Sequence, residues 1–279
     1  MLIIGLSLLP AILSSGVIAS TSVSFSQVIG ALLISLLYLL HIRILDDRRD
    51  FKHDSLYHRE RPVQKGIITL KELWKIDAVI IPVLVLGAIY YGTLASLIMI
   101  SMISYSFLAE KNFFLDNAFK KHFLIYNFVN TIQTFILQLF VYTIFTGTIP
   151  ITILLITHYA FTCTGTIIFE FVRKVKLPKE DGAGRDTYTW HLGFQRSIIA
   201  YVFLAFTDFV LFFKIMTTIS NHRVLWLPFS LFFSFVILFL SYLHLKKRTR
   251  LTEVLLQMSF LLTYTMCNLL IFFSKYNVL

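Results

Sequence analysis

The chain has 279 residues, of which 57% are apolar, 16% aromatic and only 14% charged, and its mean hydropathy is +0.77. Soluble domains carry about 25% charged residues, so this composition excludes a soluble enzyme, a disordered chain and a disulfide scaffold. The sequence therefore predicts an all-α, polytopic membrane protein that has the lipid bilayer as its surroundings.

Nine apolar stretches are long enough to cross about 30 Å of hydrocarbon as helices. They lie near residues 2–20, 25–45, 74–91, 93–109, 123–145, 150–172, 197–217, 224–245 and 253–274. The first stretch could serve as a signal sequence, but no basic region precedes it, so we expect a transmembrane helix there. No linker or low-complexity tract divides the chain. We therefore expect one integral-membrane domain over residues 1–279.

Most of the 25 Lys and Arg residues follow the even-numbered helices of this series. Nine lie in residues 43–75, three in 111–121, six in 173–196 and four in 246–250. Because cytoplasmic loops carry an excess of basic residues, we expect these loops to be cytoplasmic. If the protein is bacterial, we expect it in the inner or plasma membrane. The net charge of +10 is thus explained by topology, and we expect no nucleic-acid partner.

Five acids occur within fifteen residues directly after the second predicted helix: Asp46, Asp47, Asp50, Asp54 and Glu60. If the helix continues, the acids at 46, 50 and 54 recur every four residues and project from one face. Crowded carboxylates at a membrane interface suit Mg²⁺, which prefers oxygen ligands and phosphate-bearing substrates. The alternative is that these acids merely pair with neighbouring basic residues on a solvated loop.

A basic loop that contains Pro and Gly follows the acidic row, from His58 to Gly66. Its cations include Arg61 and Lys65, and they suit contacts with an anion. Candidate ligands for a metal and for a phosphate are therefore adjacent in the sequence, which favours the metal-site interpretation.

Residues 43–66 resemble the first motif of the UbiA superfamily of intramembrane prenyltransferases. That motif reads Asn-x-x-x-Asp-x-x-x-Asp, and the matching positions are Asp46, which replaces the Asn, Asp50 and Asp54. The resemblance covers the whole helix order and implies a UbiA-like bundle of two four-helix halves plus a ninth helix. It implies that these three acids are catalytic residues that hold Mg²⁺ for an isoprenyl diphosphate substrate. It also implies a set of basic residues that bind the diphosphate, namely Arg43, Arg61, Lys65, Arg173 and Lys174.

The second Asp-rich motif of the superfamily has its counterpart near residues 170–193, with a change of charge. Either Glu170 and Lys174 occupy the acidic pair, followed by a short insertion, or Lys176 and Glu180 do so. In both alignments a lysine replaces one acid, and lysine binds diphosphate oxygens but cannot ligate a metal. We therefore expect fewer bound Mg²⁺ ions and a catalytic role for Glu170. Its alternative role is that of an ordinary acid paired with basic residues one turn later.

Polar side chains on the fifth predicted helix share one face, among them Asn127 and Asn130. They either line the substrate cavity or form hydrogen bonds between helices. Tyr188 lies beside the expected anion site and is the aromatic candidate for the cavity wall, because ring faces stabilise a carbocation.

These features predict a Mg²⁺-dependent intramembrane prenyltransferase. Such an enzyme ionises an allylic isoprenyl diphosphate at the cytoplasmic face and transfers the prenyl group to an aromatic or lipid acceptor. The altered second motif leaves a terpene cyclase of the same superfamily as the alternative, in which a double bond of the same chain captures the cation. A lipid or isoprenoid transporter without chemistry is a third interpretation, but transporters usually carry their charges near the midplane rather than at one face.

Overall fold

The computed structural model describes residues 2–20, 22–115, 122–149, 151–177, 186–220 and 223–275. These residues form helices and connecting segments, and no strand occurs among them. Eight helices of this part are long and apolar enough to cross a membrane: α2 (Phe25–Arg49), α4 (Leu70–Tyr90), α5 (Thr93–Glu110), α7 (Phe123–Thr146), α8 (Ile153–Arg173), α10 (Phe194–Ile219), α11 (Arg223–Lys247) and α12 (Arg250–Lys275). The predicted all-α, polytopic architecture is thus confirmed.

The first predicted span also forms a helix, α1 (Leu2–Ala19). Its stretch Ser7–Ala19 is apolar but shorter than the eight helices above, so a ninth crossing stays a prediction. Three short helices complete the order: α3 (Phe51–Tyr57), η1 (Asn112–Phe114) and α9 (Tyr188–Leu192).

Helix α4 begins at Leu70, before the predicted start of its apolar stretch at residue 74, because a capping box adds a first turn. The hydroxyl of Thr69 accepts a hydrogen bond from the backbone N–H of Glu72, and the Glu72 carboxylate accepts one from the backbone N–H of Thr69. Both bonds satisfy donors that the start of a helix leaves without partners. α4 therefore extends the apolar run by a polar first turn, which hydropathy alone does not detect.

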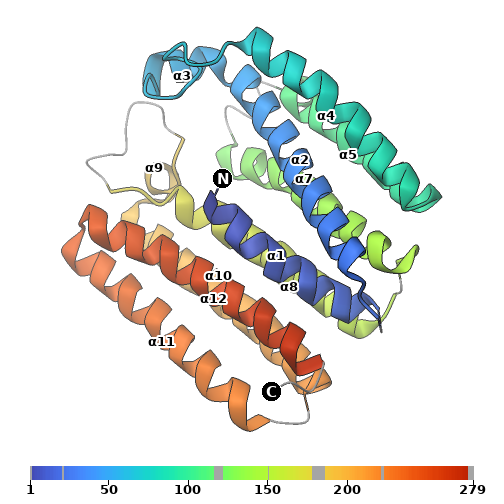
Figure 1. The fold of residues 1–279 in the computed structure, drawn as a ribbon. Helices are drawn as coiled ribbons and strands as arrows, with labels where there is room; N and C mark the ends of the chain where they lie inside the picture. The colour runs from blue at the N-terminus through green and yellow to red at the C-terminus, as the bar shows by residue number, and fades with distance from the viewer. Residues whose placement is uncertain are drawn as a thin grey trace. The chain divides into compact units, whose positions relative to one another are not determined.

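The chain divides into two compact units. The four-helix unit contains α2, α3, α4, α5, η1 and α7, and the five-helix unit contains α1 and α8 to α12. Within the five-helix unit, α1 packs against α12 and α8, so that the two ends of the helix order meet (Figure 1). The single domain expected from the sequence stays a prediction.

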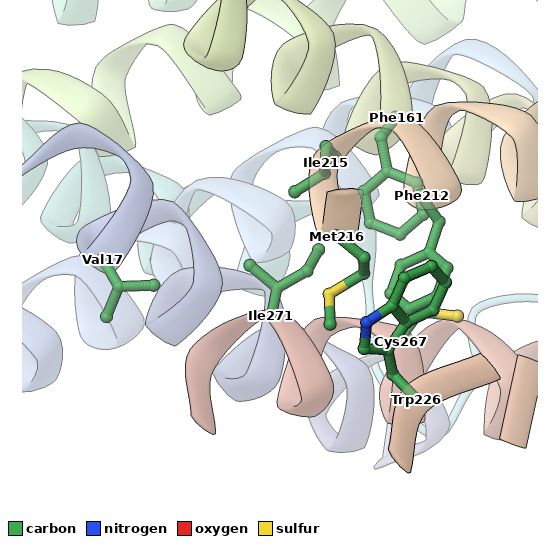
Figure 2. Packing of buried hydrophobic residues seen from close by; sticks show 8 residues of the cluster. All are labelled: Val17, Phe161, Phe212, Ile215, Met216, Trp226, Cys267 and Ile271. Atoms are coloured by element: carbon green, nitrogen blue, oxygen red, sulfur yellow. The ribbon is translucent and has the colours of Figure 1, made fainter. Parts of the chain in front are cut away.

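The core of the five-helix unit takes side chains from all of its long helices (Figure 2). They are Val17, Phe161, Phe212, Ile215, Met216, Trp226, Cys267 and Ile271. Close approach of α8 and α12 depends on Gly165, where a Cβ atom would lie 2.2 Å from a ring carbon of Tyr264. Because lipid is as apolar as these side chains, tight van der Waals packing rather than removal from water holds the helices together.

A buried polar network joins three helices of the four-helix unit. His41 on α2 lies 2.6 Å from Asp77 on α4 through Nδ1 and 2.7 Å from Ser106 on α5 through Nε2. This order resembles the hydrogen-bond chain of a hydrolase triad. However, all three side chains are buried, and the Ser106 hydroxyl donates to the carbonyl of Ile103 at 2.7 Å. We therefore interpret the network as a structural link that sets the rotation of α2.

Candidate functional site

The acidic row follows α2 as predicted, although the helix is interrupted once. α2 ends at Arg49, and α3 begins directly after Asp50. The backbone N–H of Asp50 still donates to the carbonyl of Asp46 at 2.9 Å, and that of Asp54 donates to Asp50 at 2.8 Å. The helical hydrogen-bond spacing therefore carries across the interruption and keeps the three acids one turn apart.

Two of these acids converge on one cation within the four-helix unit. The Nη2 atom of Arg49 lies 2.9 Å from Asp46 Oδ1, and its Nε atom lies 3.0 Å from Asp50 Oδ1. The Arg49 side chain is only 9% exposed, so the guanidinium is enclosed rather than spread on the surface. Two carboxylates that already surround one positive group fit a hard divalent cation in donor type and in convergence.

Helix α7 presents its polar face to the same guanidinium. Asn130 Oδ1 accepts a hydrogen bond from Arg49 Nη1 at 3.1 Å, and the guanidinium carbon lies 5.4 Å from the ring centre of Tyr126. Asn127 is buried, and its amide nitrogen donates to the carbonyl of Phe123 at 2.8 Å. The structure thus places Asn130 against the first motif, whereas the lining of a substrate cavity by either asparagine stays a prediction.

The third acid of the row has different neighbours. Asp54 forms an ion pair with Arg61, and its Oδ1 atom lies 3.7 Å from Nδ1 of His53. His58 lies in the same group, since ligand atoms of the two histidines and Asp54 are all within 4.8 Å of one another. The three predicted metal ligands therefore separate into a pair, Asp46 and Asp50, and a third acid with its own partners.

The structure does not bring Arg43 and Lys65, the other basic residues predicted for this motif, into the group formed by Arg49, Asp46 and Asp50. Arg43 Nη2 lies 2.6 Å from Asp47 Oδ1 one turn later, as the solvated-loop alternative expects of such a pair. Lys65 is exposed, and its backbone N–H donates to the carbonyl of Arg61 at 3.0 Å. Glu60 is exposed too; a backbone N–H and the nearby His58 hold the pKa of Glu60 below its ordinary value. Diphosphate binding by Arg43, Arg61 and Lys65 stays a prediction.

In the five-helix unit, the predicted acid of the second motif is surrounded by cations. Glu170 lies 2.7 Å from Arg173 and 2.9 Å from Lys174, three and four residues later on α8. These are the ion pairs that the alternative interpretation of Glu170 describes, and they also hold two cations side by side. A role for these residues in catalysis or diphosphate binding stays a prediction.

Tyr188 packs directly against this group. Its ring stacks on Phe171 with centres 4.1 Å apart, and its backbone N–H donates to the carbonyl of Lys174 at 3.0 Å. Burial raises the pKa of Tyr188, and the neighbouring Glu170 carboxylate adds to the rise. The phenol is therefore neutral at physiological pH, although its place in a cavity wall stays a prediction.

A second acid with two cations was not anticipated from the sequence. Glu253 at the start of α12 is buried and lies 2.8 Å from Lys176 and 2.5 Å from Arg250. Thr189 fixes the backbone of Lys176, because its hydroxyl accepts from the N–H and donates to the carbonyl, both at 2.9 Å. An acid in the polar first turn of an apolar helix was the available signal. The other residue of the Lys176 alignment, Glu180, lies outside the described residues.

The family model of the UbiA prenyltransferase family matches residues 7–264. The chain belongs to the UbiA prenyltransferase family. It is accordingly an integral membrane protein, and the family resemblance inferred from its first motif is confirmed. No curated protein matches the sequence.

Solved structures share the fold of this UbiA family member at low sequence identity. A UbiA homolog from Aeropyrum pernix K1 is 12% identical with a TM-score of 0.69, and the alignment covers 95% of this chain and 97% of the homolog. A digeranylgeranylglyceryl phosphate synthase gives 15% identity, a TM-score of 0.66 and coverage of 99% and 93%. A UbiA homolog from Archaeoglobus fulgidus, bound to DMAPP and Mg²⁺, gives 15%, 0.64 and coverage of 99% and 97%. The predicted UbiA-like fold is therefore confirmed.

Proposed function

We propose that this UbiA family member is a Mg²⁺-dependent enzyme that ionises an allylic isoprenyl diphosphate and transfers the prenyl group to an acceptor. The observation that carries this proposal is that the carboxylates of Asp46 and Asp50 converge on one point, which the enclosed Arg49 guanidinium occupies. Structures of UbiA homologs from Archaeoglobus fulgidus with Mg²⁺ and either DMAPP or GPP support the choice of metal and substrate class.

In this proposal, the acids of the first motif bind the metal and the basic residues of both motifs bind the diphosphate. Asp46, Asp50 and Asp54 hold the metal, and bound Mg²⁺ supplies positive charge that neutralises the diphosphate leaving group. The phosphate oxygens are bound directly by the basic residues, namely Arg43, Arg61, Lys65, Arg173 and Lys174. Glu170 holds the last two of these cations in place through its ion pairs.

The reaction begins when the bond between the allylic carbon and the diphosphate oxygen breaks. Both electrons of that bond leave with the oxygen, whose charge the cations stabilise, and the prenyl group becomes an allylic cation. An electron pair of an aromatic or lipid acceptor then forms the new bond to the allylic carbon, and the acceptor loses a proton. The basic loops indicate that this chemistry takes place at the cytoplasmic face.

The test is pyrophosphate release by the detergent-purified chain with Mg²⁺ and allylic diphosphates of several lengths, followed by mass spectrometry of the organic extract. We expect the diphosphate to bind with little turnover until an aromatic or lipid acceptor is added. A Mg²⁺-dependent cyclic hydrocarbon or alcohol formed without acceptor would instead identify a terpene cyclase, the alternative that the altered second motif keeps open. Absence of both binding and pyrophosphate release would overturn the enzymatic proposal.

A further inference from the structure

The segment after α2 places two imidazoles beside a buried carboxylate. His53, Asp54 and His58 each offer one ligand atom, and these atoms lie within 4.8 Å of one another. The Asp54 side chain is 2% exposed, whereas His53 and His58 are 38% and 27% exposed. The backbone N–H of His58 donates to the carbonyl of Asp54 at 2.8 Å, and this last turn of α3 brings the second histidine back to the acid.

The outer contacts of these side chains are of the kind that surrounds metal ligands. One oxygen of Asp54, Oδ1, faces His53, while the other oxygen accepts a hydrogen bond from Arg61. His58 Nδ1 lies 3.5 Å from Glu60 Oε1, an orientation that directs the other ring nitrogen away from Glu60. In metal sites a ligating carboxylate is itself hydrogen-bonded, and a ligating histidine usually contacts a carboxylate through its second nitrogen.

The donor set distinguishes this group from the neighbouring acid pair. Mg²⁺ prefers six oxygen ligands, whereas imidazole nitrogen together with carboxylate oxygen suits divalent transition metals such as Zn²⁺. Ligand atoms around such an ion, each about 2.0 to 2.2 Å from the metal, lie about 3 to 3.5 Å from one another. The partly exposed histidines therefore need only small side-chain rotations to close on the buried carboxylate.

We propose that His53, Asp54 and His58 form a site for a divalent transition-metal ion next to the proposed Mg²⁺ site, with Asp54 shared by the two sites. The inference adds a second metal at Asp54, but it does not depend on the proposed function, because metal binding is measurable without turnover. The ion has two imidazole nitrogens and one carboxylate oxygen as protein ligands, and solvent completes its coordination.

The experiment uses Mn²⁺ alone as the probe on the purified full chain, after removal of metals with a chelator. Pulsed electron paramagnetic resonance detects nitrogen nuclei bonded to Mn²⁺, so an ion at the acid pair contributes no such signal. We expect nitrogen coupling in the unchanged chain, its decrease in His53→Gln or His58→Gln, and its loss in the double variant. His122→Gln, which changes an exposed histidine of the same unit outside the group, is the matched control and should keep the signal.

A second measurement tests the outer contact of His58. Glu60→Gln should weaken Zn²⁺ binding about tenfold or more in competition with a chromogenic chelator, as expected for loss of a carboxylate behind a ligating histidine. Monodisperse elution of each variant from a sizing column excludes misfolding as the cause.

Two outcomes would overturn the inference: no nitrogen coupling in the unchanged chain, or full coupling in the double variant. Pyrophosphate release is then measured with Mg²⁺ as the sole metal. Release that persists in either case leaves the proposed function standing while the transition-metal site is rejected. Nitrogen coupling to Mn²⁺ without any pyrophosphate release would support the transition-metal site and reject the proposed function.

Discussion

One charged cluster of each unit combines acids and cations in opposite proportions. In the four-helix unit, Asp46 and Asp50 share the cation Arg49, whereas in the five-helix unit two cations share Glu170. Glu253 repeats the second pattern with a lysine and an arginine of its own. A surplus of carboxylates favours an added cation, and a surplus of cations favours an added anion.

Each of the two clusters therefore suits a different kind of ligand: the first suits a metal cation, and the second suits an anion such as phosphate. In the alignment that pairs Glu170 with Lys174, the lysine would replace a metal ligand by a positive charge.

The largest effect is expected from Asp50→Ala, which removes one of the two carboxylates that pair with Arg49 and that are proposed to hold Mg²⁺. Pyrophosphate release should fall by at least about a hundredfold, as on loss of a group that stabilises the leaving-group charge. Asp208→Asn is the control, because this acid lies on α10, outside both motifs, and the change should alter the rate little. Unchanged turnover in Asp50→Ala would reject the metal assignment.

The next effect concerns the charge that distinguishes the second motif. Lys174→Asp should raise the KM for the allylic diphosphate about tenfold at low Mg²⁺, the loss of about one charge-assisted contact. High Mg²⁺ should recover much of it, because the new carboxylate beside Glu170 can hold an added metal. Lys174→Met loses the same charge without gaining a ligand, so its KM should not recover; equal recovery in both variants would contradict this explanation.

A smaller effect should follow from Arg49→Met in the four-helix unit. Without the guanidinium, Asp46 and Asp50 repel each other, and we expect a loss of about 1 kcal/mol in unfolding free energy. Added Mg²⁺ should restore this loss by replacing the missing cation, which thermal unfolding with and without Mg²⁺ measures. The unchanged chain should gain less from Mg²⁺, and a variant that Mg²⁺ does not stabilise would show that these acids do not bind it.

The smallest effect is expected from Glu253→Gln in the five-helix unit. An amide still accepts hydrogen bonds from Lys176 and Arg250, which are partly exposed, so the loss should be about 0.5 to 1 kcal/mol. Asp208→Asn is the matched control: this acid is also buried, and its Oδ1 atom has no hydrogen-bond partner among the described residues. Thermal unfolding should show a decrease for the first variant only, and equal decreases would argue against a specific role for the cations around Glu253.

Much of the fold could be predicted because the bilayer restricts it so strongly. A helix that crosses hydrocarbon needs about 20 apolar residues, and eight of the nine apolar stretches are confirmed as helices of that kind. The acidic row was likewise visible, since a spacing of four residues needs only local helical geometry. The polar first turn of α4 was missed because its capping box depends on hydrogen bonds rather than on hydropathy.

The partners of the predicted site residues were beyond the reach of sequence patterns. Arg49 reaches Asn130 on another helix, and Lys176 reaches Glu253 at the start of the last one. These residues are far apart in the chain, and no local periodicity relates them. The grouping of His53 and His58 with Asp54 is local, but it depends on a short helix whose side-chain directions the sequence does not specify.

The helical, membrane-spanning class, the two charged motifs and the family to which the chain belongs follow from the amino-acid sequence alone. Lipid satisfies no backbone hydrogen bonds, so long apolar runs have almost no alternative to helices. The packing of α1 against α12 and the ion pairs of Arg49 with two acids of the first motif become visible only in the folded chain. Those choices depend on which helix faces meet, and helix packing is set by side-chain shape and polar contacts between distant segments.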